Sequence, residues 1–384
     1  MARRHPIFTD EHDMLRDSLR SFIEKELAPH AEAWEQQGGF PHDEVFKRLG
    51  ELGFLGITLP EKYGGADAGF VSSIVFAEEM VGCNSGGVGA SIGLHTNIAL
   101  PYIAELGTEE QKQKYLIPGT KGELIGSLGV TEPGAGSDVA SIRTSAVRDG
   151  DAYVINGSKM FITNGGIADY VILAAKTDRD TEHAGISLFI VDKGTPGSVV
   201  SLDLDKLGWR TCNTAELAFD DVRVPRSAML GEEGRGFYHI MAHFQEERLY
   251  MAVGSVAAAQ KALELASEYA KERVQFGKPI ANFQVTRHKI ADMATEIEAA
   301  RQLVYNTTRL HIEQEDCQAE VAMCKLYACE MATRVMNEAI QIFGGYGYMM
   351  EYPVQRMWRD ARINTIGGGT SEIQREIIGR LMLR

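Results

Sequence analysis

Apolar residues recur with the period of an α-helix through the first third of the chain. The first such segment follows Thr9, a residue type that caps helices, and Pro29 predicts its end. Its apolar positions are Met14, Leu15, Leu19, Phe22, Ile23 and Leu27. Further helices are expected over residues 41–53, 71–83, 92–106 and 109–116, with a Gly- and Pro-rich loop over 54–69.

The pattern changes to short strands near residue 124. The stretch YVINGSKMFITNG has two strand-like runs around Asn156-Gly157, a pair that predicts a tight hairpin turn. Four more runs follow, YVILAAKT, ISLFIVDK, LDLDKLG and AELAFDDVRV. Their spacing is typical of a small β-barrel or β-sandwich.

A helical period returns near residue 236 and continues to the end of the chain. Three long segments over 236–273, 283–313 and 317–343 are expected to pack as a bundle. We therefore predict an α+β fold with a helical domain (1–123), a β domain (124–235) and a four-helix-bundle domain (236–384). The sequence lacks the glycine motifs of nucleotide-binding α/β folds.

One helical face in the third domain carries an unexpected carboxylate. At about 100° per residue, one stripe roughly 60° wide contains Ile240, Phe244, Glu247, Met251 and Ala258. A carboxylate on a buried stripe is costly unless it is paired or functional. Glu246 lies about 100° away, so Glu247 is expected to face inward and Glu246 outward. A core carboxylate paired with a distant arginine remains the alternative reading of Glu247.

The face that carries Glu246 also carries His239 and His243, which raises the possibility of a metal site. The HExxH pattern is missing, and two histidines four residues apart on a long helix more often lie at a surface or an interface. We therefore expect no metal.

The stretch TIGGGTSEIQ, residues 365–374, runs from three glycines into a helix. Ser371 is expected to cap this helix, with Gln374 reaching back as in a capping box. Backbone N–H groups at such a place form a niche for an anion or a carbonyl oxygen. No acid or base stands among the glycines, so a reactive side chain has to come from elsewhere.

Composition narrows the function classes. The 384 residues carry a net charge of −14, which gives no support to nucleic-acid binding. None of the five cysteines forms a CxxC pair, as is typical of reduced thiols in a cytosolic protein. The N-terminus has no apolar signal region, and no run approaches the ~18 apolar residues of a membrane span. A cytoplasmic protein without a membrane span is expected.

Five separated motifs carry a resemblance to a known family. They are TEPGAGSD (131–138), KMFITNG (159–165), RVQFGKPI (273–280), QIFGGYGY (341–348) and GGTSEIQR (368–375). In this order, and with the α–β–α arrangement, the chain resembles the acyl-CoA dehydrogenase family over essentially its whole length. The resemblance implies FAD as cofactor and oxidation of acyl-CoA thioesters to trans-2-enoyl-CoA in fatty-acid β-oxidation. It also implies an electron-transfer flavoprotein as acceptor and a homotetramer that shares its FAD sites.

The resemblance also assigns residues to the cofactor. Contacts with FAD are expected from Leu128, Val130, Thr131, Gly136, Ser137, Phe161, Ile162, Thr163, Arg273, Phe276, Gln284, Gln341, Ile342, Gly344, Gly345, Thr370, Ser371 and Glu372. Of these, Arg273, Gln284 and residues 341–345 are expected to reach FAD partly from a neighbouring subunit. Substrate contacts are expected from Ser137, Gln245, Arg248, Gly368 and Gly369.

The catalytic base is where this chain departs from most of the family. Most members carry the catalytic glutamate at the position that matches Gly368. A smaller branch, the long-chain and isovaleryl-CoA dehydrogenases, has it in the long helix before Arg-Leu, as in Glu247-Arg248-Leu249. By this resemblance Glu247 is the base, and the Gly368 N–H donates to the thioester carbonyl.

The small residues of VGCNSGGVGASIG (81–93) lie near the expected acyl tail and favour medium-to-long straight chains. Short branched chains of the isovaleryl type are the second choice. Two alternatives come from other classes. One is a flavin monooxygenase, against which an inward base argues. The other is a subunit that binds flavin or acyl-CoA without turnover, against which the relocated base and the intact flavin motifs argue. An acyl-CoA oxidase usually carries a further C-terminal domain.

Overall fold

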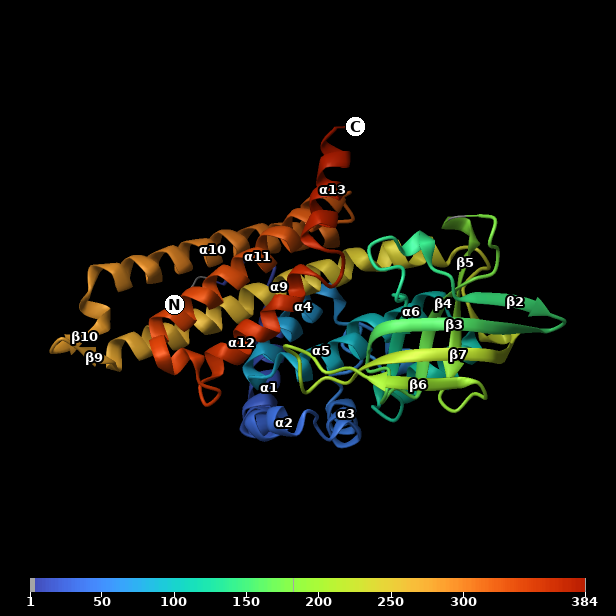
Figure 1. Cartoon of the computed structure of the whole chain (residues 1–384), viewed down its shortest axis with the longest axis horizontal. Helices are drawn as coiled ribbons and strands as arrows, with labels where there is room; N and C mark the ends of the chain where they lie inside the picture. The colour runs from blue at the N-terminus through green and yellow to red at the C-terminus, as the bar shows by residue number, and fades with distance from the viewer. Residues whose placement is uncertain (1–3, 182, 384) are drawn as a thin grey trace.

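The computed structural model describes residues 4–181 and 183–383. Its first part is helical and is drawn in blue in Figure 1. The helices are α1 (Asp10–Phe22), α2 (Ala31–Gln37), α3 (His42–Glu51), α4 (Gly69–Met80), α5 (Gly86–Leu94), α6 (Leu100–Leu106), α7 (Glu109–Gln111) and α8 (Ile117–Thr120). The expected helices are present, and α2 is a helix that the apolar pattern did not predict.

An eight-stranded sheet follows in the chain. Its strands are β1 (Gly126–Gly129), β2 (Ser145–Asp149), β3 (Ala152–Thr163), β4 (Tyr170–Lys176), β5 (Ile186–Asp192), β6 (Ser198–Asp203), β7 (Thr214–Pro225) and β8 (Met229–Leu230). They are ordered β6-β7-β3-β2-β4-β5-β8, with β1 parallel to β4. The predicted α+β class is confirmed.

The hairpin predicted at Asn156-Gly157 is wrong. Strand β3 runs straight through these residues, and the turn before it lies at Gly150, where φ is +63°. The pairing of β3 with β7 shifts register between Ile155 and Gly157. A Cβ at Gly157 would lie 2.5 Å from Thr144 Oγ1. The Asn-Gly pair therefore marks a β-bulge with close backbone approach, a second structure that favours the same residues.

Long helices form the last part of the chain. They are α9 (Gly236–Glu272), α10 (Gln284–Ile312), α11 (Gln318–Phe343), α12 (Pro353–Ala361) and α13 (Ser371–Met382), with the small strands β9 (Val274–Gln275) and β10 (Lys278–Pro279) between α9 and α10. Helices α9, α10 and α11 pack on one another, and α13 packs on α11. None of the helices described is long and apolar enough to cross a membrane.

Helix α9 connects the two ends of the molecule. Its 37 residues span roughly 55 Å, from the sheet at one end to the β9–β10 hairpin at the other (Figure 1). Along this length it contacts α4 of the first part and β5 of the sheet. A residue in its first third therefore lies where all three parts of the chain meet.

Candidate active site

Glu247 lies in this first third of α9 and faces the interior. Its Oε1 atom is buried without a hydrogen-bond partner. Burial raises the pKa of Glu247 to about 8, against the opposing effect of Arg248. Tyr102 lies close by on α6, and its pKa is raised by burial and by the charge of Glu247. The core-pair alternative is not supported, because no salt bridge to Glu247 occurs among the residues described.

The neighbouring Glu246 has a different environment. It accepts a hydrogen bond of 3.0 Å from His311 Nε2, and its side chain is 44% exposed. The predicted contrast in orientation between the two adjacent glutamates is thus confirmed.

The two histidines on this face do not form a metal site with Glu246. The ring of His243 stacks on Tyr102 at 3.9 Å between centroids, and its Nε2 contacts Glu105 at 3.1 Å. Across residues 4–181 and 183–383, no group of three or more His, Cys, Asp and Glu side chains could hold a metal ion.

The glycine turn lies directly against α9. Gly368 and Gly369 have φ of +63° and +90°, conformations that side chains rarely adopt. A Cβ at Gly368 would lie 2.8 Å from Sδ of Met251, which follows Glu247 by one helical turn. Both the backbone conformation and the Met251 side chain therefore favour glycine at 368.

The carbonyl oxygens of this turn are held from three directions. Arg248 Nε donates to the Gly368 carbonyl at 3.2 Å, and Lys325 Nζ donates to the Gly369 carbonyl at 2.6 Å. The Gln374 amide donates to both, at 3.3 and 3.0 Å. Within the described part of the chain, the N–H groups of Gly368 and Gly369 have no acceptor. The turn thus presents two unpartnered donors next to α9, the helix that carries Glu247.

The predicted cap of α13 is off by one residue. Thr370 is the N-cap, and its Oγ1 accepts a hydrogen bond of 3.3 Å from Ile373 N. Ser371 is the first helical residue. Gln374 does reach back, but it donates to the glycine carbonyls and does not complete a capping box. Both hydroxyl residues suit a cap, and sequence alone did not separate them.

Hydrogen bonds hold two of the segments expected to bind the cofactor, residues 127–131 and 159–163, next to each other. Ser127 Oγ donates to the Thr163 carbonyl at 2.6 Å, and Met160 N donates to the Thr131 carbonyl at 2.8 Å. The buried Lys159 Nζ donates to the Val130 carbonyl at 3.0 Å and to Glu132 at 2.7 Å. Leu128, Val130 and Thr131 therefore lie next to the strand that carries Phe161, Ile162 and Thr163.

Phe161 is the unusual residue of this surface. Its φ is +62°, rare for a bulky residue, and its side chain is 66% exposed. The register of β3 against β7 shifts between Lys159 and Ile162, so a bulge turns the ring outward. Val130 and Ile162 are buried in the core and offer only backbone groups. Gly136 and Ser137 lie exposed on the adjoining loop.

The remaining expected cofactor residues form a separate group at the far end of the bundle. These are Arg273, Phe276, Gln284, Gln341, Ile342, Gly344 and Gly345. Phe276 is 93% exposed, whereas Ile342 is buried. Figure 1 shows the β9–β10 hairpin at the opposite end of the molecule from the sheet. One chain therefore does not bring the two groups together.

Gln245 does not point toward Glu247. At 100° per residue it lies about 200° from Glu247 around the helix. Its Nε2 donates to the Met241 carbonyl of its own helix at 3.4 Å, and its Oε1 is buried without a partner.

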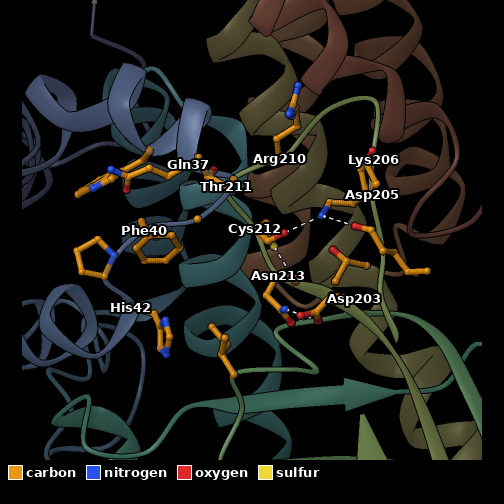
Figure 2. A pocket seen from close by; sticks show the side chains of 17 residues that line it. Gln37, Phe40, His42, Asp203, Asp205, Lys206, Arg210, Thr211, Cys212 and Asn213 are labelled. Atoms are coloured by element: carbon orange, nitrogen blue, oxygen red, sulfur yellow. Dashed lines mark hydrogen bonds between the residues drawn. The ribbon is translucent and has the colours of Figure 1, made fainter. Parts of the chain in front are cut away.

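A cavity of about 740 Å³ lies elsewhere. Figure 2 shows it between residues 34–42 of the first part and the loop over 203–214, with Arg210 and Asp205 near its rim. None of the residues predicted for cofactor or substrate lines this cavity. It adjoins the β3 segment through Asn213, whose Oδ1 accepts a hydrogen bond of 2.6 Å from Gly166 N.

Sequence reasoning missed Lys325 and the role of Gln374. Lys325 is buried on α11 among Val321, Ala322, Ala328 and Cys329. These lie three and four residues away on either side, so Lys325 stands on an apolar stripe as Glu247 does. The same periodicity test, applied to α11, would have found it.

Comparisons with known proteins identify relatives over the whole chain. Family models match residues 9–123 (acyl-CoA dehydrogenase, N-terminal domain), 127–222 (middle domain) and 234–383 (C-terminal domain). The mouse mitochondrial long-chain specific acyl-CoA dehydrogenase is 42% identical, covering 97% of this chain and 87% of its own. Potato mitochondrial isovaleryl-CoA dehydrogenase is also 42% identical, covering 98% and 92%. The crystal structure of an acyl-CoA dehydrogenase from Geobacillus kaustophilus superposes with a TM-score of 0.96 at 45% identity, covering 99% of this chain and 100% of that one.

The raised pKa of Glu247 predicts a pH-dependent stability. The folded protein keeps a proton on Glu247 up to about pH 8, whereas the unfolded chain loses it near pH 4.5. The stability contributed by this group therefore falls as pH rises through that window, and Glu247→Gln removes the loss. The midpoint of thermal unfolding of Glu247→Gln should exceed that of the parent by more at about pH 9 than at about pH 5.

Glu246→Gln is the matched control, because Glu246 is paired and partly exposed. Its unfolding midpoint should show no such gain at high pH. Parallel curves for the parent and Glu247→Gln would mean that Glu247 titrates as an ordinary carboxylate.

Proposed function

The chain belongs to the acyl-CoA dehydrogenase family of oxidoreductases, and we propose that it desaturates an acyl-CoA between Cα and Cβ with Glu247 as the base. The observation that carries the proposal is the buried, unpartnered Oε1 of Glu247 beside a glycine turn with two free N–H groups. A base and fixed donors on the carbonyl oxygen are the two requirements for removing the weakly acidic α-proton.

The residues of the site suit these roles. A carboxylate with a pKa near 8 is a stronger base than an ordinary glutamate, provided that it is ionised when substrate is bound. Glu247 takes the α-proton on its free oxygen. The N–H groups of Gly368 and Gly369 receive the thioester carbonyl oxygen, where negative charge develops. Arg248, whose pKa is lowered by burial, fixes the Gly368 carbonyl on the other side of the turn.

The surface around Phe161 fits FAD, the cofactor we propose. An exposed aromatic side chain, held outward by a bulge and a strained backbone, offers a flat apolar face for a ring system. Thr131 and Thr163 flank it with polar groups. When bound, FAD accepts the β-hydrogen as a hydride. The residues of the bundle tip would hold its adenosine half from a neighbouring subunit, within a homotetramer that passes electrons to an electron-transfer flavoprotein.

For the substrate we propose medium or long straight-chain acyl-CoA. Helix α5 is rich in glycine, and Gly93 faces Tyr250, since a Cβ there would lie 3.0 Å from the Tyr250 hydroxyl. A cavity of about 360 Å³ on the flank of α9 is lined by Tyr250, Asn97 and Glu246. This space suits an extended tail better than a short branched one. Short branched chains of the isovaleryl type are the alternative, because the isovaleryl and long-chain relatives are equally similar to this chain.

The adjacent glutamates provide a test of the base. Glu247→Gln keeps the size of the side chain but removes the basic oxygen. We expect anaerobic flavin bleaching by acyl-CoA to slow by about 10²- to 10⁴-fold. Glu246→Gln, which removes only the His311 pair, should bleach at nearly the parent rate. Stopped-flow absorbance measures both.

The reverse result, an inactive Glu246→Gln and an active Glu247→Gln, would refute the assignment of Glu247 as the base. A base restored at the family's commoner position, Gly368→Glu in the Glu247→Gln background, needs space that Met251 occupies. Recovery of activity is therefore expected only when Met251→Ala is added. A flavin that no acyl-CoA bleaches in the parent would favour the monooxygenase or the non-catalytic subunit.

Substrate preference is tested with a panel. Straight-chain acyl-CoAs from C4 to C18 and isovaleryl-CoA are compared by kcat/KM with the same electron acceptor. A maximum at a medium or long straight chain is expected, because the cavity beside Tyr250 accepts an extended tail. A maximum at isovaleryl-CoA would select the branched-chain alternative.

Shared FAD sites predict that cofactor retention depends on assembly. Phe276→Ser at the bundle tip should lower the FAD content and shift the protein from tetramers to smaller species. Ile312→Ser, which also removes an exposed apolar side chain but lies outside the expected contacts, should do neither. Light scattering and the flavin-to-protein absorbance ratio measure both. A monomer with stoichiometric FAD would rule out the shared site.

A further inference from the structure

We propose that Lys325 is a positioning residue whose charge stabilises the negative charge that develops on the thioester carbonyl oxygen. This inference rests on the proposed function and concerns a residue outside the motifs that carry the family resemblance. It assigns to Lys325 a role through the glycine turn, without contact with the substrate.

Lys325 is a buried cation without an anionic partner. It is 1% exposed on α11, and its one hydrogen bond within the described residues joins Nζ to the Gly369 carbonyl at 2.6 Å. The charged or titratable groups that influence it are Arg248, Glu372 and Cys329, and it forms no salt bridge with any described carboxylate. Burial lowers its pKa.

This position is unfavourable for a positive charge on three grounds. Burial removes the hydration of the ammonium group, and among the described residues the one carboxylate that favours its charge, Glu372, forms no salt bridge with it. The contact also lies just before the N-terminus of α13, the positive end of the helix dipole. A neutral donor such as Gln374, which binds the same carbonyl, would satisfy Gly369 at lower cost. The charge itself therefore requires an explanation beyond stability.

The geometry of the turn supplies that explanation. In a trans peptide the C=O and the following N–H point in opposite directions. Because Arg248 and Gln374 hold the Gly368 carbonyl, the Gly369 N–H is aimed away from them. Lys325 holds the next carbonyl, and its Cε lies 4.0 Å from the position of a Cβ on Gly368. The cation thus contacts the same turn, at the peptide that directly follows the two free N–H donors.

The chemistry needs positive potential at this place. When the α C–H bond breaks, its proton moves to Glu247, and its electron pair spreads over the α-carbon and the carbonyl oxygen. Donors fixed in a low-dielectric site stabilise that charge, and a cation behind them adds to their effect. Arg248 contributes positive potential from α9, and Lys325 contributes it from α11.

The test uses acetoacetyl-CoA, a thioester that becomes an enolate without losing a β-hydrogen. Its apparent pKa, read from the enolate absorbance, reports the potential at the carbonyl oxygen. Measurement in the Glu247→Gln background removes the titration of the base. We expect Lys325→Met to raise this pKa by about one unit, a tenfold loss of enolate preference. In the Glu247-containing protein, kcat should fall about 10- to 100-fold with little change in KM.

Two further variants separate charge from shape. Lys325→Gln keeps a donor for the Gly369 carbonyl but no charge, so it should show the raised enolate pKa of Lys325→Met. Lys325→Arg keeps the charge and should restore much of the parent value. Val321→Ala, one turn earlier on the same buried face and without a titratable group, should leave the enolate pKa and kcat unchanged. If Lys325→Met does not fold, the Gln and Arg variants still decide the question.

An enolate pKa in Lys325→Gln equal to that of the parent would overturn the proposal. A neutral hydrogen-bond donor to the Gly369 carbonyl would then be enough to stabilise the enolate. Failure of the proposed function has a different signature. In that case the parent itself would not bleach its flavin with any acyl-CoA, whatever the enolate titration of its Lys325 variants.

Discussion

The desolvated carboxylate of Glu247 is the constraint around which the site is organised. An ionised carboxylate without a partner costs several kcal/mol in a protein interior. The chain relieves part of this cost by raising the pKa of Glu247 to about 8, so that the ligand-free group holds its proton near neutral pH. The adjacent Glu246 avoids the cost through His311 and partial exposure. Two identical side chains, one residue apart, thus have opposite chemical characters because a helix turns 100° per residue.

The place of Glu247 on a long helix determines what the glycine turn becomes. The proposed base, Glu247, is held on α9, a long helix that packs against α4, α10 and α11. Met251, one turn further, fills the space that a side chain at 368 would need. The turn then consists of backbone alone, and its carbonyls need partners from outside. Arg248, Gln374 and Lys325 supply them from α9, α13 and α11. The proposed base on the helix and the glycine at 368 therefore belong to one packing arrangement.

Periodicity and resemblance predicted the class of fold, the long helices and the inward direction of Glu247, because each depends on which face of an element is buried. They failed where one local pattern fits two structures. Asn156-Gly157 suits a hairpin turn and a bulge equally, and only the pairing of β3 with β7 decides. Thr370 and Ser371 both suit a cap. Lys325 was missed for another reason, since its meaning depends on a carbonyl 44 residues away in the chain. The separation of the expected FAD contacts into two distant groups is likewise a property of the whole fold.

The charges of the site explain why a neutral pocket would not stabilise the proposed proton transfer. Before the proposed reaction, the ionised Glu247 lies next to the buried cation Arg248, and the second buried cation, Lys325, lies on the glycine turn. After proton transfer Glu247 is neutral, and the negative charge has moved to the carbonyl oxygen. The site carries one negative charge before and after the transfer. What changes is the distance of that charge from the two cations. Arg248 is next to Glu247 in sequence, and its Nε holds the Gly368 carbonyl, whereas Lys325 stands behind Gly369. In the proposed reaction the charge moves from Glu247 to a carbonyl oxygen at the glycine turn, which Lys325 contacts directly, so the cation on α11 favours the product of proton transfer more than the reactant. In a low-dielectric site that difference lowers the barrier instead of only tightening binding.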